Sequence, residues 1–166
     1  MEDFIAVQAC GTPQQILDKL DDRSSKLNAT YQRVAYLQAA TLYNDNRYQE
    51  ALPLLDKSLR YPEDDALRAA AQVLKGDIFS FGQQYPSAIT AYQAAARTSR
   101  RAGAADTDYD QQARYGLGYA YYNTKDYAQA RQQFQAWLRD PVAKPTDANY
   151  YDVTLRVGDL AYLAKQ

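Results

Sequence analysis

The chain contains no histidine, and its 166 residues include a single cysteine, Cys10. Histidine is the most common general base, so its absence excludes Ser-His and Cys-His nucleophile pairs and most transition-metal sites. One cysteine can form neither an intrachain disulfide nor a multi-cysteine metal site. We therefore predict that Cys10 is a small buried apolar residue.

Long apolar runs and an excess of one charge are also missing. Nothing approaches the roughly 18 consecutive apolar residues of a membrane span. The 19 basic and 20 acidic side chains are interleaved along the chain and leave a net charge of −1. Because binding of a polyanion requires a basic patch, we do not predict nucleic-acid binding. Because a long apolar run is missing, we do not predict direct membrane insertion.

Charged pairs are the remaining candidates for chemistry. Asp64 and Asp65 could be catalytic carboxylates or metal ligands, but they stand where a helix is expected to begin and negative charge offsets the dipole. Arg97 and Arg100 lie near an expected helix C-terminus, where the same compensation applies to positive charge. No glycine-rich phosphate loop of the usual spacing is present. We predict no enzymatic activity, and therefore no catalytic residue, cofactor or metal site.

Residues 1–23 are predicted to form a leading helix. Thr12 and Pro13 are a typical helix start, and an apolar stripe follows over residues 16–20. Residues 4–10 could instead be the end of a secretion signal. That segment is short and follows acidic residues where a signal carries positive charge, so the helix is favoured.

Three segments of the chain share one pattern, residues 43–51, 80–88 and 122–130. In each, a short polar turn precedes a tyrosine, and an alanine follows three residues later. These alanines, which are 37 and then 42 residues apart, are Ala51, Ala88 and Ala130. Self-similarity at such a period indicates a repeat architecture.

Each repeat has the composition of two helices joined by a turn. The first helix carries apolar residues at helical spacing. It also carries a small residue where a second helix must approach closely, namely Ala39, Gly76 or Gly118. Large residues of the second helix are predicted to fill the space between the two helices, namely Leu55, Tyr92 and Phe134.

The second helix of each repeat is predicted to begin at the tyrosine, Tyr48, Tyr85 or Tyr127. This tyrosine can pack across the turn onto the first helix. Asn46 and Asp126 precede two of these tyrosines and are placed to cap the helix.

The last of the three segments carries a spaced set of apolar, small and aromatic residues, namely Leu117, Gly118, Tyr121, Tyr127, Ala130, Phe134 and Pro141. This pattern resembles a tetratricopeptide repeat. Residues 69–95 match that pattern nearly as well, and residues 32–62 match it more loosely. The three matches are in tandem and cover roughly residues 24–145.

Two features depart from the family pattern. The first is that the repeats are longer than the family's usual period of about 34 residues. The surplus follows Ala95, where the second helix is predicted to extend into a loop at Ala102 and Gly103. Pro53 falls inside a second helix, where proline costs up to about 3 kcal/mol, so we expect a kink there.

The resemblance implies an all-α fold, a right-handed superhelical α-solenoid of antiparallel helix pairs with about seven to eight helices. We predict a single domain over residues 1–166. Its parts are the leading helix 1–23, repeat 1 at 24–62, repeat 2 with an extended second helix and loop at 63–108, repeat 3 at 109–145, and a half repeat or capping helix at 146–166. The broad apolar surface of the last segment favours a fragment of a longer array over a natural cap.

In tetratricopeptide arrays the first helices line the concave face. The resemblance therefore implies a partner-binding groove with the candidate residues Arg33, Tyr36, Tyr43, Asp77, Phe81, Tyr115, Tyr119, Tyr122 and Asn123. Exposed aromatic residues in a groove suit an extended or helical peptide. The alternative is that half of these tyrosines pack between neighbouring repeats.

Family members that bind chaperone C-terminal carboxylates use a clamp of Lys, Arg and Asn on that face. The matching positions here hold Tyr36, Ala40, Val73 and Asp77. The clamp is missing, so a co-chaperone role of this kind is not expected.

The leading hypothesis is a non-catalytic interaction scaffold that holds a protein or peptide segment in a tyrosine-rich concave groove. The alternative is a structural spacer within a longer repeat or multidomain protein, with no ligand of its own. The unpaired terminal helix also offers a surface for a homo-oligomer. Abundant Ala, Gln and Tyr with few Lys favour a bacterial origin, and we expect a soluble protein of the cell envelope or periplasm.

Overall fold

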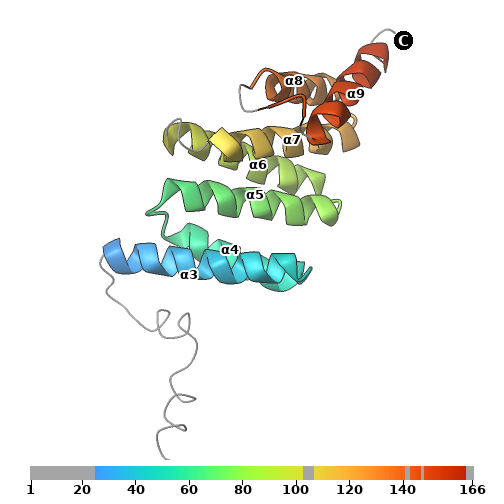
Figure 1. Cartoon of the computed structure of the whole chain (residues 1–166). Helices are drawn as coiled ribbons and strands as arrows, with labels where there is room; N and C mark the ends of the chain where they lie inside the picture. Colours follow the sequence, from blue (N-terminus) through green and yellow to red (C-terminus); the bar gives the residue numbers. More distant parts are fainter. Residues whose placement is uncertain (1–24, 103–106, 141–142, 147, 164–166) are drawn as a thin grey trace, which may run out of the picture. The chain divides into compact units, whose positions relative to one another are not determined.

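The computed structural model describes residues 25–102, 107–140, 143–146 and 148–163. Within these ranges the protein is all-α, and consecutive helices pack in adjacent pairs (Figure 1). The seven described helices are α3 (Ser25–Asn44), α4 (Tyr48–Arg60), α5 (Asp65–Phe81), α6 (Tyr85–Ala102), α7 (Thr107–Asn123), α8 (Tyr127–Leu138) and α9 (Ala148–Leu163). The chain divides into two compact units, residues 1–67 and 68–166, which we describe separately.

The predicted second helices begin where the sequence placed them. Their first residues are the three tyrosines of the repeated pattern, Tyr48 in α4, Tyr85 in α6 and Tyr127 in α8. The alanines three residues later are fully buried in all three helices. The ring of Tyr48 lies 5.6 Å from that of Tyr43, and the ring of Tyr127 lies 5.7 Å from that of Tyr122. The predicted packing across the turn is therefore confirmed in two of the three hairpins.

The turns after α3, α5 and α7 have the same backbone geometry. Each contains one residue with a left-handed φ, which is 59° at Asn46, 57° at Gln83 and 63° at Lys125. The N–H of the next residue bonds to a carbonyl five residues back, as in the 2.8 Å bond from Arg47 to Leu42. This pattern is the Schellman motif, which satisfies carbonyl groups at the end of a helix. The repeat seen in the sequence is therefore also a repeat of backbone conformation.

One of the two predicted caps is correct. The Asp126 side chain accepts a hydrogen bond from the Gln129 N–H at 3.2 Å and caps α8. The prediction for Asn46 is wrong, because the residue preceding α4 is Arg47 and no side chain caps this helix. Asn46 takes the left-handed position of the turn, and its side-chain Oδ1 accepts a hydrogen bond from the Tyr48 hydroxyl at 2.7 Å.

In the first unit, a buried polar side chain of α3 forms hydrogen bonds to the segment after α4. Gln32 is fully buried, and its amide both donates to the Asp64 carbonyl and accepts from the Asp64 N–H, each at 2.8 Å. The Ser58 hydroxyl donates to the Gln32 carbonyl at 3.0 Å. Tyr31 packs edge-on against Tyr61 with ring centroids 5.2 Å apart. Burial of an amide is tolerated here because both of its polar atoms have partners.

Asp64 starts α5 as the sequence analysis expected. Its carboxylate accepts hydrogen bonds from the N–H groups of Ala66 and Leu67 at 2.9 and 3.1 Å. These are two of the donors that a helix leaves unsatisfied at its first turn. The acidic pair Asp64 and Asp65 is thus part of a helix start.

In the second unit, an aromatic side chain packs against glycines of two helices. Tyr92 of α6 is 2% exposed. A Cβ added at Gly76 of α5 would lie 2.5 Å from its ring, and a Cβ added at Gly116 of α7 would also overlap that ring. The same relation holds between Gly118 of α7 and Phe134 of α8. The predicted close approach at Gly76 and Gly118 is therefore confirmed, and an aromatic ring of the second helix fills the space.

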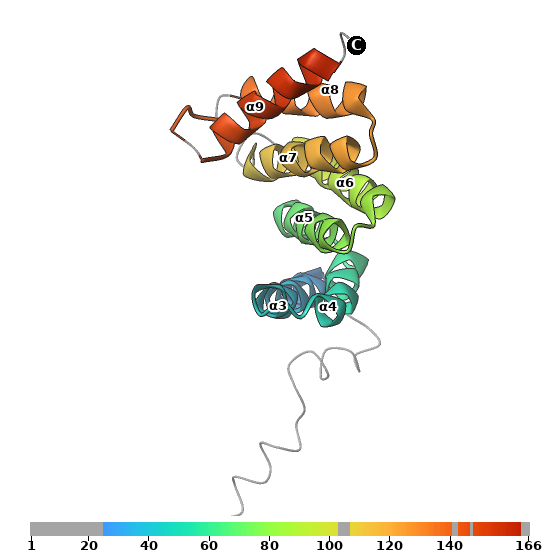
Figure 2. The same cartoon turned by 90° about the vertical axis from the view of Figure 1, so that its right-hand side faces the viewer.

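Helix α9 packs against α8, and hydrogen bonds tie it to α7 (Figure 2). Val153 and Leu160 of α9 are buried together with Phe134 and Trp137 of α8. The Trp137 ring lies 6.2 Å from that of Tyr115 and 6.4 Å from that of Tyr150. Val153 and Leu160 of the last segment therefore complete a core with the helices before it.

The two departures from the family pattern are partly visible. Pro53 lies inside a continuous α4, on its exposed side. Helix α6 reaches Ala102 and is longer than α4 and α8, which confirms the extension after Ala95. The leading helix 1–23, Cys10, Gly103, Pro141 and the chain's last three residues lie outside the described residues. No described helix is long and apolar enough to cross a bilayer.

Candidate functional site

Three of the nine candidate residues lie on α3 in the first unit. Arg33 is exposed, and Tyr36 and Tyr43 are half-buried. The Tyr43 ring packs at a tilt against the Tyr48 ring across the turn. Arg33 and Tyr36 are the two residues of this group that lie away from the turn.

Two further candidates lie on α5 in the second unit. The Asp77 carboxylate accepts a hydrogen bond of 2.6 Å from the hydroxyl of Tyr92. Asp77 therefore orients a buried aromatic ring, which is a structural role. Phe81 is the last residue of α5 and is 59% exposed. An exposed aromatic side chain of this kind is suited to contact with another protein.

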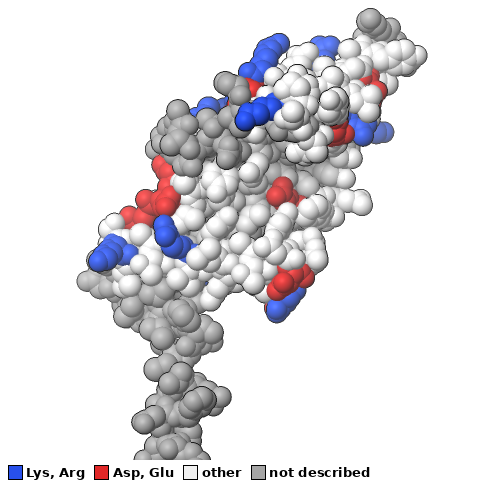
Figure 3. All heavy atoms as spheres, viewed as in Figure 1, with Lys and Arg blue, Asp and Glu red and all other residues white. Residues whose placement is uncertain are grey.

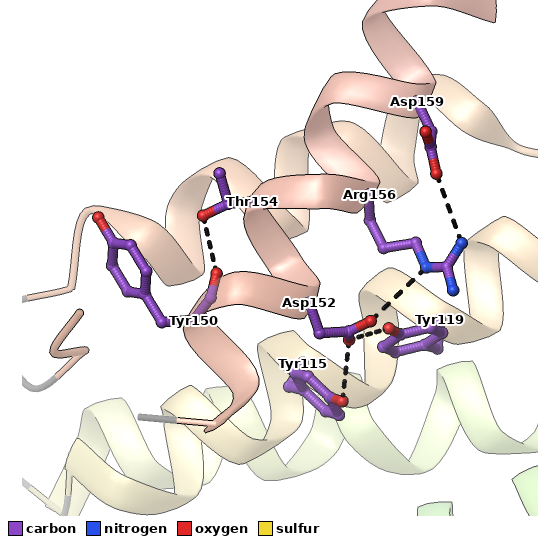
Figure 4. Close-up of polar contacts among 7 residues, drawn as sticks. All are labelled: Tyr115, Tyr119, Tyr150, Asp152, Thr154, Arg156 and Asp159. Atoms are coloured by element: carbon purple, nitrogen blue, oxygen red, sulfur yellow. Dashed lines mark hydrogen bonds and ion pairs between the residues drawn. The ribbon is translucent and has the colours of Figure 1, made fainter. Parts of the chain in front are cut away.

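The remaining candidates all lie on α7, and they are Tyr115, Tyr119, Tyr122 and the helix's last residue, Asn123. The rings of Tyr115 and Tyr119 are 5.1 Å apart. Both hydroxyls donate to Oδ2 of Asp152 on α9, at 3.3 Å from Tyr115 and at a shorter distance from Tyr119 (Figure 4). The structure therefore brings these two tyrosines together on one carboxylate.

Arg156 completes this cluster from the next turn of α9. Its Nε lies 3.8 Å from Oδ1 of Asp152, and its guanidinium reaches Asp159 at 3.5 Å. The guanidinium carbon also lies 5.7 Å from the centre of the Tyr122 ring, within range of a cation–π contact. Three candidate tyrosines of α7 therefore contact two charged residues of α9.

Burial and the Asp152 carboxylate together hold protons on the two tyrosines. Burial raises the pKa of the Tyr119 hydroxyl well above its usual value, and the hydrogen bond to Asp152 raises this pKa further. Burial also raises the pKa of Tyr115, and the negative charge of Asp152 adds to that effect. A tyrosinate beside a carboxylate would repel it, so both hydroxyls remain hydrogen-bond donors at neutral pH.

We predict that Tyr119 stays protonated above pH of about 10, the usual tyrosine value. A folded-state pKa above the unfolded value contributes stability that is complete below that pH and is lost as the pH rises through the folded pKa. NMR of isotope-labelled tyrosine, with Tyr119→Phe used for assignment, measures this ionisation directly. Asp152→Asn should lower the pKa of Tyr119, because it removes the adjacent negative charge. Ionisation of Tyr119 with its usual pKa in the unmodified chain would contradict the prediction.

Asp152 and Arg156 were not among the candidates from the sequence. Their spacing of four residues is typical of a helical ion pair and was a usable signal. Their role nevertheless depends on α9 lying against α7. The hydroxyl partners are 33 and 37 residues away in the sequence.

A separate pocket lies where α6, α7 and α8 meet. Its lining includes Arg97 and Arg100 of α6, Arg114 of α7 and Gln133 of α8. Asp110 binds Arg114 at 2.6 Å and lies 3.8 Å from Arg100, so part of this positive charge is neutralised within the fold. None of the nine candidate residues lines this pocket.

The face in Figure 3 shows no large patch of one charge that would suggest a second binding site. Acidic and basic side chains lie on this face in small groups of both signs. Within the described ranges, no three His, Cys, Asp or Glu residues are arranged to hold a metal ion.

Comparisons of the chain with family models, with curated proteins and with solved structures find no match. The tetratricopeptide resemblance therefore rests on the repeated residues and the repeated turn of this chain alone.

Proposed function

We propose that the chain is a right-handed superhelical α-solenoid of tetratricopeptide-like repeats that acts as a non-catalytic scaffold for a protein or peptide segment. The observation that carries this proposal is the recurrence of one hairpin, with the same turn and the same buried alanine, in α3–α4, α5–α6 and α7–α8. Stacked hairpins of this kind form extended concave surfaces in repeat proteins. Such a surface binds by shape and by a few exposed anchors, without chemistry of its own.

The candidate residues differ in how exposed they are. Within the second unit, hydrogen bonds already engage the hydroxyls of Tyr115 and Tyr119 and the carboxylate of Asp77. Arg33 of the first unit is an exposed charged residue, and Phe81 of the second unit is an exposed aromatic residue. Arginine and aromatic residues are enriched among residues that dominate binding energy. We therefore assign partner binding to one exposed anchor on each unit, Arg33 on the first and Phe81 on the second.

The alternative function is a structural spacer within a longer repeat or multidomain protein, with no ligand of its own. The hydrogen bonds from Tyr115 and Tyr119 to Asp152 favour it, because they use two of the candidate groove residues to join α7 to α9. For the setting of either function, we propose a soluble protein of the bacterial cell envelope or periplasm.

Selection from a random peptide library displayed on phage distinguishes the scaffold hypothesis from the spacer hypothesis. The full chain is immobilised, and peptides that it enriches are synthesised and measured by fluorescence anisotropy. For the scaffold, Phe81→Ala and Arg33→Ala should each weaken binding about tenfold or more, as expected for residues that anchor a ligand. Arg131→Ala, on the exposed side of α8, is the matched control and should leave the affinity unchanged.

The spacer alternative predicts a different outcome of this selection. Either no peptide is enriched over an empty surface, or enriched peptides bind equally to Phe81→Ala, Arg33→Ala and Arg131→Ala. Both outcomes would reject Arg33 and Phe81 as binding anchors.

A further inference from the structure

The pocket where α6, α7 and α8 meet is lined by arginine side chains from two helices. Arg97 and Arg100 come from α6, and Arg114 comes from α7. The cavity has a volume of about 240 Å³, and no described Asp or Glu is among its lining residues. Ala96 and Leu117 also line it and belong to the buried core of the second unit. This cavity, which we call the arginine pocket, therefore lies within one packed unit.

Helical spacing and one carboxylate bring the three arginines together. Arg97 and Arg100 are three residues apart, so they share one side of α6. Asp110 holds the third arginine, because its Oδ2 lies 2.6 Å from Nε of Arg114. Asp110 is 9% exposed, and this ion pair therefore fixes the direction of the Arg114 side chain from inside the fold.

The positive charge of the pocket is only partly balanced. The Arg100 guanidinium lies 3.8 Å from Oδ1 of Asp110, which is too long for a hydrogen bond. Arg97 has no ion pair or hydrogen bond with the described residues. Three guanidinium groups thus share one carboxylate, and two positive charges remain unbalanced. Like charges three residues apart on a helix are unfavourable by themselves, and an anion in the pocket would relieve their repulsion.

Compensation of the α6 dipole, expected from the sequence, explains these arginines incompletely. Helix α6 ends at Ala102, and the dipole effect falls off within the last turn. Arg100 lies in that turn, but Arg97 lies before it. Arg114 stands in the middle of α7, away from either end of that helix. A shared anion accounts for all three side chains.

The donors of the pocket favour a phosphate group over a carboxylate. A phosphate monoester carries about −1.5 to −2 charges at pH 7 and three strong acceptor oxygens, which matches the two unbalanced positive charges. Guanidinium groups bind phosphate through paired N–H donors. Gln133 adds an amide from a third helix, and the Gln93 amide is held by a 2.9 Å hydrogen bond to the Tyr121 hydroxyl. A carboxylate has only two oxygens, fewer than these side chains can engage.

We propose that the arginine pocket binds a phosphate group, either free or carried by a small molecule as a monoester. Pockets that bury drug-sized ligands measure about 300–1,000 Å³, so this smaller cavity suits a phosphate with a short organic body. Leu117 would contact that body, while the three arginines hold the phosphate. The pocket contains neither Arg33 nor Phe81, so this proposal and the proposed scaffold can fail independently.

The test titrates the full chain with inorganic phosphate and, separately, with glycerol 3-phosphate. Isothermal titration calorimetry measures the affinity at about 150 mM NaCl, where attraction between distant surface charges is screened. NMR of the isotope-labelled chain should show shifts of the Nε–H signals of Arg97, Arg100 and Arg114. Equal affinity for the two compounds would identify free phosphate as the ligand. Tighter binding of glycerol 3-phosphate would identify a small phosphate monoester.

Arg97→Gln and Arg100→Gln are the decisive variants. Both side chains are exposed, so these variants should unfold at the same denaturant concentration as the original chain. Each removes charge-assisted hydrogen bonds to the phosphate, so the affinity should fall at least about tenfold. Arg131→Gln is the matched control, because Arg131 is exposed on α8 and does not line the pocket. It changes the net charge equally and should leave the affinity unchanged.

Three results would overturn the proposal. One is the absence of binding of either phosphate compound up to about 10 mM. Another is an equal loss of affinity in Arg97→Gln and Arg131→Gln, which would indicate general electrostatic attraction. A third is that succinate, a dicarboxylate, binds as tightly as glycerol 3-phosphate, which would show that the pocket does not select phosphate.

Discussion

Replacing Phe134 with alanine is expected to lower the free energy of unfolding of the second unit by about 3–5 kcal/mol. The side chain is fully buried, rests on Gly118 and packs edge-on against Tyr119 at 5.2 Å. Glycine offers no side chain to move into the space that the ring leaves. The resulting cavity therefore adds to the lost transfer free energy, and the effect should lie within the usual range for a buried aromatic residue.

Trp137 provides the measurement, because it is the chain's single tryptophan and lies one turn from Phe134 in the same core. Its fluorescence in denaturant titrations reports unfolding of the second unit. Gln132→Ala, on the exposed side of α8, is the matched control and should change stability by no more than about 0.5 kcal/mol. If Phe134→Ala and Gln132→Ala unfold at the same denaturant concentration, the assigned core of α7, α8 and α9 is incorrect.

Gly116→Ala is expected to destabilise the second unit by about 1–3 kcal/mol, although alanine is the better helix former by about 1 kcal/mol. The added Cβ would overlap the Tyr92 ring, which also lies against Gly76. The ring cannot turn aside easily, since its hydroxyl donates to Asp77 at 2.6 Å and its surface is 2% exposed. The penalty is thus steric and depends on Tyr92.

Two comparisons isolate that steric cause in the same Trp137 denaturant titration. In a Tyr92→Ala background, Gly116→Ala should become neutral or stabilising, which gives a coupling of about 2 kcal/mol in a double-mutant cycle. Gly158→Ala, where the Cβ meets no atom, should stabilise the chain by up to about 1 kcal/mol. Equal effects of Gly116→Ala and Gly158→Ala would show that Tyr92 does not pack on Gly116.

The positions of the helices could be predicted closely from local patterns. The second helices begin at the predicted tyrosines, and Asp126 caps α8, because start signals and apolar spacing act within a few residues. Asn46 was misassigned as a cap because asparagine is favoured both at that position and in the left-handed turn that it adopts. Only the backbone conformation distinguishes the two.

The candidate surface was less predictable than the helices. Sequence spacing placed Tyr115 and Tyr119 together on one side of a helix, and the structure has their rings 5.1 Å apart. Sequence spacing could not show that their hydroxyls bond to Asp152, because that residue lies more than 30 positions further along the chain. The same limit applies to Gln32, whose partner is the backbone of Asp64.

The sequence by itself determined that this protein is built of paired helices, where most of them begin, and which small residues lie at close contacts. These features follow from helical periodicity and turn chemistry, which act along the chain. The tertiary structure decided which tyrosines support α9, which rings cover Gly76, Gly116 and Gly118, and that Gly158 has open space above it. Those properties depend on helices distant in sequence packing together, and no local pattern encodes them.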